Sequence, residues 1–141
     1  MDPYLQFLAQ HPVLSTALGA IVVLVILNEM SGALTGDRRV TPLEAVRLIN
    51  DRNAVVLDLR APAEYKRGHI LHAVNLPHGK LDERLAEVTK EKERPVVLVC
   101  ALGGVAPQAA HRLKRAGLAE VYSLKGGLNG WLGASLPVTS K

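Results

Sequence analysis

A long stretch without charge near the start of the chain most strongly limits what this sequence can fold into. No Asp, Glu, Lys or Arg lies between Pro3 and Asn28, and residues 13–27 are almost wholly apolar. A single helix over residues 3–28 would be about 39 Å long, whereas the hydrocarbon layer of a membrane is about 30 Å thick. The sequence therefore predicts one N-terminal transmembrane helix within a membrane anchor over residues 1–30.

Two other kinds of segment, a core helix and a cleaved signal peptide, also contain long apolar runs. A core helix packed at a surface has a polar stripe on its exposed side, and this run has none. A cleaved signal peptide begins with basic residues, but here the run is preceded by Asp2 and by no Lys or Arg, although the small residues at 31–33 would suit a signal peptidase. We therefore favour an anchor that is retained.

The basic residues nearest the apolar run set its expected orientation. Arg38 and Arg39 follow the run, and no Lys or Arg precedes it. Basic residues concentrate on the cytoplasmic side of membrane spans. We expect a single-pass protein of a bacterial cell inner membrane, with the lipid bilayer as one partner and the C-terminal domain in the cytoplasm.

The rest of the chain has the composition of one folded domain. Residues 31–39 are short, polar and glycine-bearing, which predicts a linker, and residues 40–139 then form the domain. The net charge is +4, but the basic residues are interleaved with Asp and Glu and only 4% of residues are aromatic. This pattern argues against a nucleic-acid partner.

Helical and strand-like patterns alternate along the domain. Thr41, Pro42 and Glu44 form the pattern of a capping box at the start of a helix over residues 41–50. The strand-like runs are rich in β-branched residues and lie at 54–59, 73–76, 95–100 and 120–124, and the further helical patterns lie at 63–67, 81–88 and 107–116. This alternation predicts an α/β fold with a parallel sheet and helices on both faces.

Cys100 is the only cysteine, so its chemistry is that of a free thiol. It lies at the carboxyl end of the run 95–100, where open parallel sheets bind their ligands. Gly103 and Gly104 allow backbone N–H groups to turn inward, and the helix near Pro107 adds partial positive charge, so a thiolate or persulfide would be stabilised. Alternatively, Cys100 is a buried small hydrophobic residue that ends a strand. No cysteine spacing predicts a metal site.

Three separated stretches of the domain, in order, resemble the rhodanese-like (sulfurtransferase) family. They are "VVLDLRAPAEYKRGHILHAVNLP" at 55–77, "VVLVCALGG" at 96–104 and "VYSLKGGLNGW" at 121–131. The resemblance implies the parallel sheet deduced above and a loop cysteine, Cys100, that accepts a sulfane sulfur from a donor and passes it to an acceptor. It also implies that the amides of the loop bind the substrate, without metal or cofactor; these residues are Ala101, Leu102, Gly103, Gly104, Val105 and Ala106.

The loop departs from the family's usual Cys-x-x-Gly-x-Arg pattern, because Val105 stands in place of Arg and Ala106 in place of the Ser that often follows. A dianion such as thiosulfate loses a charge-assisted contact, so we expect weak or no thiosulfate activity. Two functions remain open: a membrane-anchored sulfur transferase or persulfide carrier acting through Cys100, and a non-catalytic binding module tethered to the membrane.

Other residues of the resembling stretches are predicted to be structural. Asp58 and Arg60, two residues apart at a strand end, would fix the following loop through charge-assisted hydrogen bonds. Gly68 and His69 would form a turn, and Trp131 would pack in the core.

Overall fold

The computed structural model describes the backbone of residues 2–34 and 38–141. The chain falls into two units, one with residues 1–35 and the other with residues 36–141.

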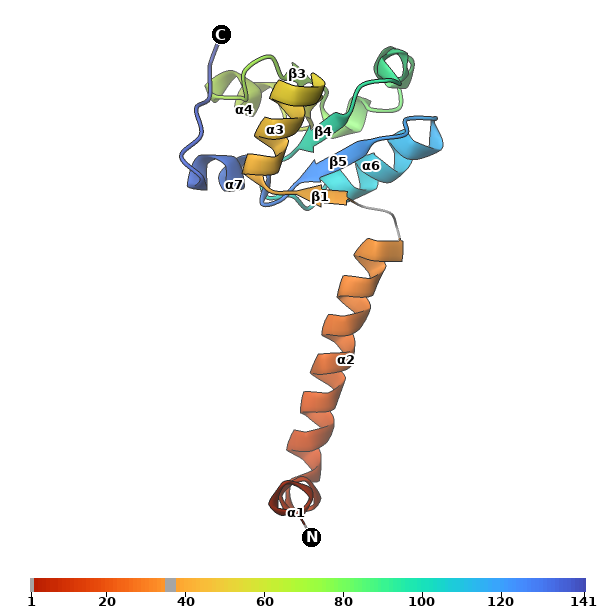
Figure 1. Ribbon diagram of the computed structural model, residues 1–141, viewed down its shortest axis with the longest axis vertical. Coiled ribbons are helices and arrows are strands. Elements are labelled where there is room, and N and C mark those ends of the chain that lie inside the picture. Colours follow the sequence, from red (N-terminus) through yellow and green to blue (C-terminus); the bar gives the residue numbers. More distant parts are fainter. Residues whose placement is uncertain (1, 35–37) are drawn as a thin grey trace. The chain divides into compact units, whose positions relative to one another are not determined.

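The N-terminal unit contains two helices, α1 (Pro3–Gln10) and α2 (Pro12–Leu34), and the single helix expected over residues 3–28 is therefore wrong (Figure 1). His11 lies between the two helices, and its backbone angles, φ −125° and ψ 62°, are not helical. Proline disfavours helical geometry in the residue before it, and its ring nitrogen has no hydrogen to donate. Within the described residues, neither helix alone has the length and hydropathy of a membrane span; α1 and residues 12–28 of α2 reach them together, but their axes bend by 101°.

The segment between the two units is shorter than the expected linker at 31–39. Helix α2 extends through Leu34, and strand β1 (Arg38–Val40) already belongs to the sheet. Arg38 and Arg39 pair with Tyr122 and Ser123, so the sheet begins two residues before the predicted start of the domain. Residues 35–37 lie outside the described residues.

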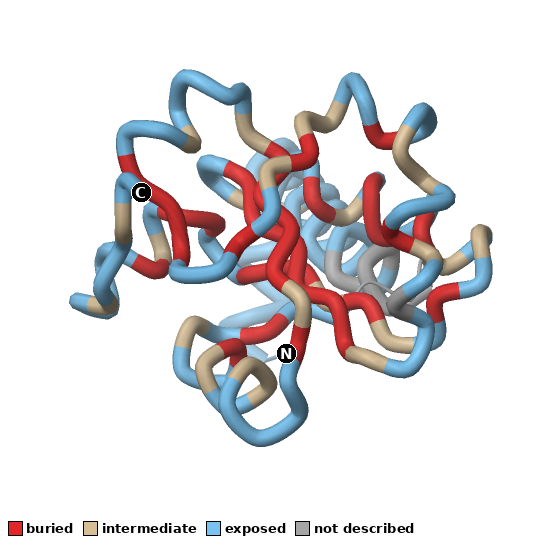
Figure 2. The backbone as a smooth tube through the Cα atoms, turned by 90° about the horizontal axis from the view of Figure 1, so that it is seen from above, coloured by how far each residue is buried: buried red, intermediate tan, exposed pale blue. Residues whose placement is uncertain are grey.

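The second unit is built on a five-stranded sheet with the order β1-β5-β4-β2-β3, in which every pairing is parallel. The remaining strands are β2 (Val55–Asp58), β3 (Val74–Asn75), β4 (Val96–Val99) and β5 (Val121–Leu124). All four residues of the central strand β4 are fully buried, which explains its continuous apolar sequence. Buried segments run through the interior of this unit, and exposed segments lie around them (Figure 2). The four strands predicted from the sequence are present, and β1 is the strand that the prediction missed.

Helices cover both faces of this sheet, as predicted (Figure 1). One apolar cluster includes α5 (Leu85–Val88) and α6 (Ala106–Arg115), and the other includes α3 (Pro42–Arg52) and α7 (Gly127–Gly133). The remaining helices are short; they are α4 (Pro62–Arg67), η1 (His78–Lys80) and η2 (Thr89–Glu91). Cys100 belongs to the cluster on the α5 and α6 face.

The start of α3 has the capping box that the sequence predicts. The Thr41 side chain accepts a hydrogen bond from Glu44 N, and the Glu44 carboxylate accepts one from Thr41 N at 2.7 Å. The hydrogen bonds from Thr41 lower the pKa of the Glu44 carboxyl group. Helix α5 begins at Leu85 rather than at residue 81, and α7 was not expected as a helix.

Candidate functional site

The candidate site is the loop that joins strand β4 to helix α6. Cys100 follows the last residue of β4 directly, and residues 101–105 lead to the first turn of α6 at Ala106. The strand lies between β5 and β2, so Cys100 is at the carboxyl edge of the sheet centre. This is the edge at which open parallel sheets bind ligands.

The sulfur of Cys100 is held from within its own loop. Gly103 N donates a hydrogen bond to Sγ at 2.8 Å, and Gly103 has a φ of +89°. That backbone conformation is easily reached only by glycine. Of the six loop amides expected to surround the sulfur, only that of Gly103 donates a hydrogen bond to Sγ in the described structure. The residue Cys100 as a whole is 5% exposed.

The other loop residues differ widely in exposure. The side chains of Leu102 and Val105 are open to solvent, with Leu102 72% exposed and Val105 38%. Ala101 and Gly104 are also exposed, whereas Ala106 is fully buried in the core cluster that contains Cys100. The loop therefore presents an apolar surface to solvent and lacks any charged side chain.

Helix α7 fixes the backbone on which this loop starts. Leu128 N donates to Cys100 O at 2.7 Å, and Asn129 N donates to Ala101 O at 3.2 Å. A Cβ on Gly127 would lie 2.2 Å from Cys100 O, so only glycine permits this approach. Sequence reasoning missed this support, although the adjacent glycines 126 and 127 were the available signal.

Asp58 and Arg60 form a buried ion pair at the end of β2. The Asp58 carboxylate accepts hydrogen bonds from Arg60 N at 3.0 Å, Nε at 2.9 Å and Nη2 at 2.6 Å. Arg60 Nη2 also donates to Gly68 O at 2.7 Å. The pair thus joins the end of β2 to the turn that follows α4.

His69 and Trp131 are both held inside the fold. His69 is 3% exposed; its Nδ1 lies 2.8 Å from Tyr65 O, and its ring stacks on the Tyr65 ring at 3.7 Å. Trp131 is 5% exposed and donates from Nε1 to Pro137 O at 3.0 Å. Desolvation by burial is the main cause that raises the pKa of Tyr65. These rings fill the core and hold turns in place.

A pocket of about 400 Å³ opens beside Ala101. Its polar side chains come from α4 and α7 and from the ion pair, and it is lined by Arg60, Glu64, Arg67, Gly68, Ala101, Leu128, Asn129, Leu132 and Val138. The Arg67 side chain has no hydrogen bond or ion pair with another described residue, and it lines the pocket together with the Glu64 carboxylate. The sequence analysis did not single out Arg67, because its closeness to the Cys100 loop depends on the tertiary fold.

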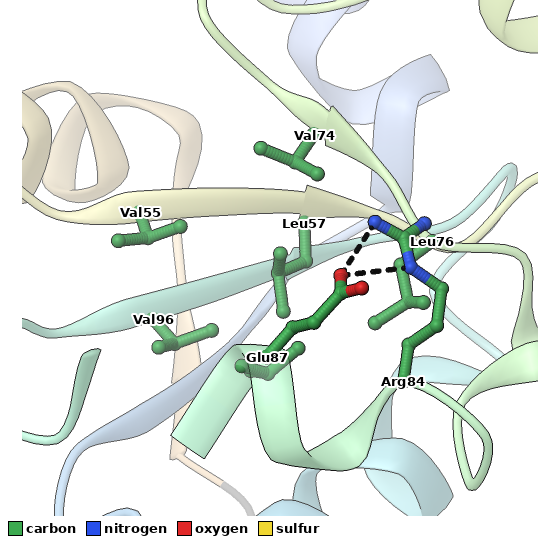
Figure 3. Close-up of a pocket in the computed structure, with 8 residues that line it drawn as sticks. Val55, Leu57, Val74, Leu76, Arg84, Glu87 and Val96 are labelled. Atoms are coloured by element: carbon green, nitrogen blue, oxygen red, sulfur yellow. Dashed lines mark hydrogen bonds and ion pairs between the residues drawn. The ribbon is translucent and has the colours of Figure 1, made fainter. Parts of the chain in front are cut away.

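A second pocket, of about 170 Å³, lies away from Cys100. Figure 3 shows it lined by valine and leucine side chains of β2, β3 and β4, with the Arg84–Glu87 ion pair beside it. It includes Val96, at the opposite end of β4 from Cys100, and it contains no nucleophile. Among the described residues, no group of three or more His, Cys, Asp or Glu side chains is placed to hold a metal ion.

Known proteins are similar to this chain in sequence and in fold. The family model described as rhodanese-like domain matches residues 41–134. The uncharacterized protein YibN of Escherichia coli is 36% identical over 139 residues, which cover 98% of this chain and 97% of that protein. The thiosulfate sulfurtransferase GlpE of Coxiella burnetii is 36% identical over 94 residues, covering 67% of this chain and 86% of that enzyme. A solved structure, the rhodanese-related protein of Thermoplasma volcanium, superposes with a TM-score of 0.65 at 27% identity, over 74% of this chain and 99% of that one.

Proposed function

The chain belongs to the rhodanese-like domain family, and from that premise we propose that it transfers sulfane sulfur through Cys100. The observation that carries this proposal is the position of the single thiol. It lies at the carboxyl end of the central strand, with the Gly103 N–H directed at its sulfur. A relative that is 36% identical is a thiosulfate sulfurtransferase.

The proposed reaction has two steps. The Cys100 thiolate attacks the sulfane sulfur of a donor such as thiosulfate; a new S–S bond forms, the donor's S–S bond breaks, and sulfite leaves with the bonding electron pair. A thiolate acceptor then takes the terminal sulfur as its own persulfide, and the Cys100 thiolate is regenerated. The Gly103 N–H, which donates to Sγ, stabilises the negative charge of the Cys100 thiolate before the first step and after the second.

Inorganic thiosulfate is expected to be a poor donor for this protein. Val105 replaces the usual loop cation, and the exposed side chains Leu102 and Val105 are apolar. Loss of one hydrogen bond to a charged group typically costs about 1.5–3 kcal/mol. A persulfide donor depends less on such a contact, so we expect it to load Cys100 faster than thiosulfate does.

Mass spectrometry of the full-length protein tests the proposal. The protein is incubated with thiosulfate or with glutathione persulfide, and the mass of the peptide that contains Cys100 is measured. We expect a gain of one sulfur, about +32 Da, that is absent in Cys100→Ser and is removed by cyanide. No gain with either donor would reject sulfur transfer.

One observation favours a second function, that of a non-catalytic binding module. Cys100 is 5% exposed, whereas Leu102 beside it is 72% exposed. An apolar loop over a buried thiol is suited to contact with a protein surface. If Cys100 takes up no sulfur from any donor, this function becomes the better explanation of the site.

We also propose that α2 anchors the domain in a bacterial inner membrane, with the domain in the cytoplasm. The part of α2 over residues 12–28 falls short of a membrane span by itself, but the whole 23-residue helix is about 35 Å long, and residues 13–28 include no charged group. Arg38 and Arg39 follow the helix, which favours a cytoplasmic domain. Extraction of the protein from membranes by alkaline carbonate, or activity of a reporter fused after Lys141 only in the periplasm, would contradict this proposal.

A further inference from the structure

We infer that α1 is an interfacial helix, which lies along the membrane surface with one side in the lipid. The inference rests on the proposed anchoring by α2 and adds to it a second, separate contact with the bilayer. The N-terminal unit then has two membrane elements with different functions: α2 crosses the hydrocarbon layer, and α1 fixes the level at which that crossing starts.

Helix α1 runs almost perpendicular to α2. The axes of Pro3–Gln10 and of residues 12–28 of α2 differ by 101°. If α2 follows the membrane normal, α1 therefore lies within 101 − 90 = 11° of the membrane plane. The bend has a covalent cause, because Pro12 cannot donate a backbone hydrogen bond and His11 before it has left the helical region. Figure 1 shows the two helices meeting at this sharp bend.

The apolar and polar side chains of α1 lie on different sides of the helix. At 100° per residue, Tyr4, Leu5, Phe7 and Leu8 share one arc of about 160°. Gln6 and Gln10 lie on the opposite side of the helix. All four apolar side chains are at least 47% exposed, and no residue of α1 is buried by the rest of the described chain. This is the pattern of a helix whose apolar side is covered by lipid.

The residue types of α1 suit the boundary between lipid headgroups and acyl chains. Between Pro3 and Gln10 the helix contains two aromatic rings and no charged residue. Aromatic residues concentrate at the level of the headgroups, where a ring can be half in lipid and the Tyr4 hydroxyl can remain in water. Without Lys or Arg, α1 has no electrostatic attraction to anionic lipid, so a neutral phosphatidylcholine bilayer is a sufficient partner.

Single-cysteine labelling of the full-length protein tests this inference. In Cys100→Ser, which removes the one native cysteine, new cysteines are placed at Gln6, Gln10, Leu5 or Leu8. Each variant is reconstituted at one copy per phosphatidylcholine nanodisc and treated with a charged, membrane-impermeant maleimide. We expect the cysteines at positions 6 and 10 to react at least 10-fold faster than those at positions 5 and 8.

Two control variants separate the failure of this inference from failure of the anchor. A cysteine at Ala20, within α2, should be protected, and one at Lys141 should react fully. Equally fast reaction at all four α1 positions would place the helix in water, and equal protection of all four would place it inside the hydrocarbon. If Ala20→Cys is protected, either of these results overturns the interfacial helix but not the anchor. Fast reaction of Ala20→Cys overturns the anchor, and the interfacial helix with it. Protection of positions 5 and 8 that appears only when two copies share a disc would identify a second chain as the occupant and would also overturn the inference.

Discussion

Replacing Gly127 with alanine is expected to separate α7 from the Cys100 loop. A Cβ at Gly127 would lie 2.2 Å from Cys100 O and 2.8 Å from both C and O of Ala101. These are backbone atoms, which cannot turn aside as the end of a flexible side chain can. Gly127 also has a φ of +58°, which is unfavourable for alanine.

The expected loss of stability follows from these contacts. The left-handed conformation costs a non-glycine residue about 1–2 kcal/mol. Crowding inside a packed region typically costs about 1–3 kcal/mol. If α7 moves away to relieve the crowding, the hydrogen bonds to Cys100 O and Ala101 O are lost instead, at about 0.5–1.5 kcal/mol each. We therefore expect a total loss of about 2–5 kcal/mol by either route.

Thermal unfolding of the full-length protein provides the measurement, with Gly133→Ala as the matched control in the same helix. A Cβ at Gly133 meets nothing within 4 Å, so this change should be neutral or slightly stabilising. Gly127→Ala should lower Tm by about 8 °C or more and speed the alkylation of Cys100. If both variants unfold at the same temperature, α7 does not support the loop as described.

Three further changes test other parts of the fold and site. Thr41→Ala removes the helix cap and should cost about 1 kcal/mol of unfolding free energy at neutral pH. In the folded state the pKa of the Glu44 carboxyl group is lowered from its ordinary value of 4.5. The stabilisation that this carboxylate contributes is therefore present above pH 4.5 and is lost as the pH falls through the lowered pKa. Denaturant titrations at pH 7 and pH 3 should show a smaller effect of Thr41→Ala on the free energy of unfolding in acid. Asp58→Asn leaves the Arg60 charge, in a side chain that is 8% exposed, without its partner, and should cost about 3–5 kcal/mol in denaturant titrations, whereas Glu87→Gln in the exposed ion pair should cost less than about 1 kcal/mol. Val105→Arg restores the loop cation and should lower the KM for thiosulfate by about 10- to 100-fold in a sulfite-release assay; an equal gain with Gln108→Arg, one turn further along α6, would show that the charge alone matters and its position does not.

The sequence predicted most of the second unit because its signals are local. The capping box at Thr41 and the apolar run of β4 depend on neighbours along the chain, and the structure has both. Strand β1 was missed because it has only three residues, two of them arginines, and forms by pairing with β5. Pro12 was a local signal too, but the apolar composition around it was given more weight.

The support of the candidate site could not be predicted from local patterns. Helix α7 contains three glycines and has poor intrinsic helix propensity. It forms because Leu128 and Trp131 are buried against the sheet and because its first amides reach the Cys100 loop. Arg67 comes close to Ala101 only in the folded chain. The sequence therefore identified the thiol, its strand and its loop, but not the neighbouring residues that α4 and α7 supply.

The order of the strands also limits when the protein can fold during its synthesis. Strand β1 is made first, yet its one neighbour in the sheet is β5, and the paired residues Arg38 and Tyr122 are 122 − 38 = 84 positions apart. Until the ribosome has released β5, the nascent chain holds a short basic strand without a neighbour, and β4 has one side of its backbone unpaired. If α2 is the membrane anchor proposed above, it is synthesised before β5 and can enter the bilayer before the sheet closes.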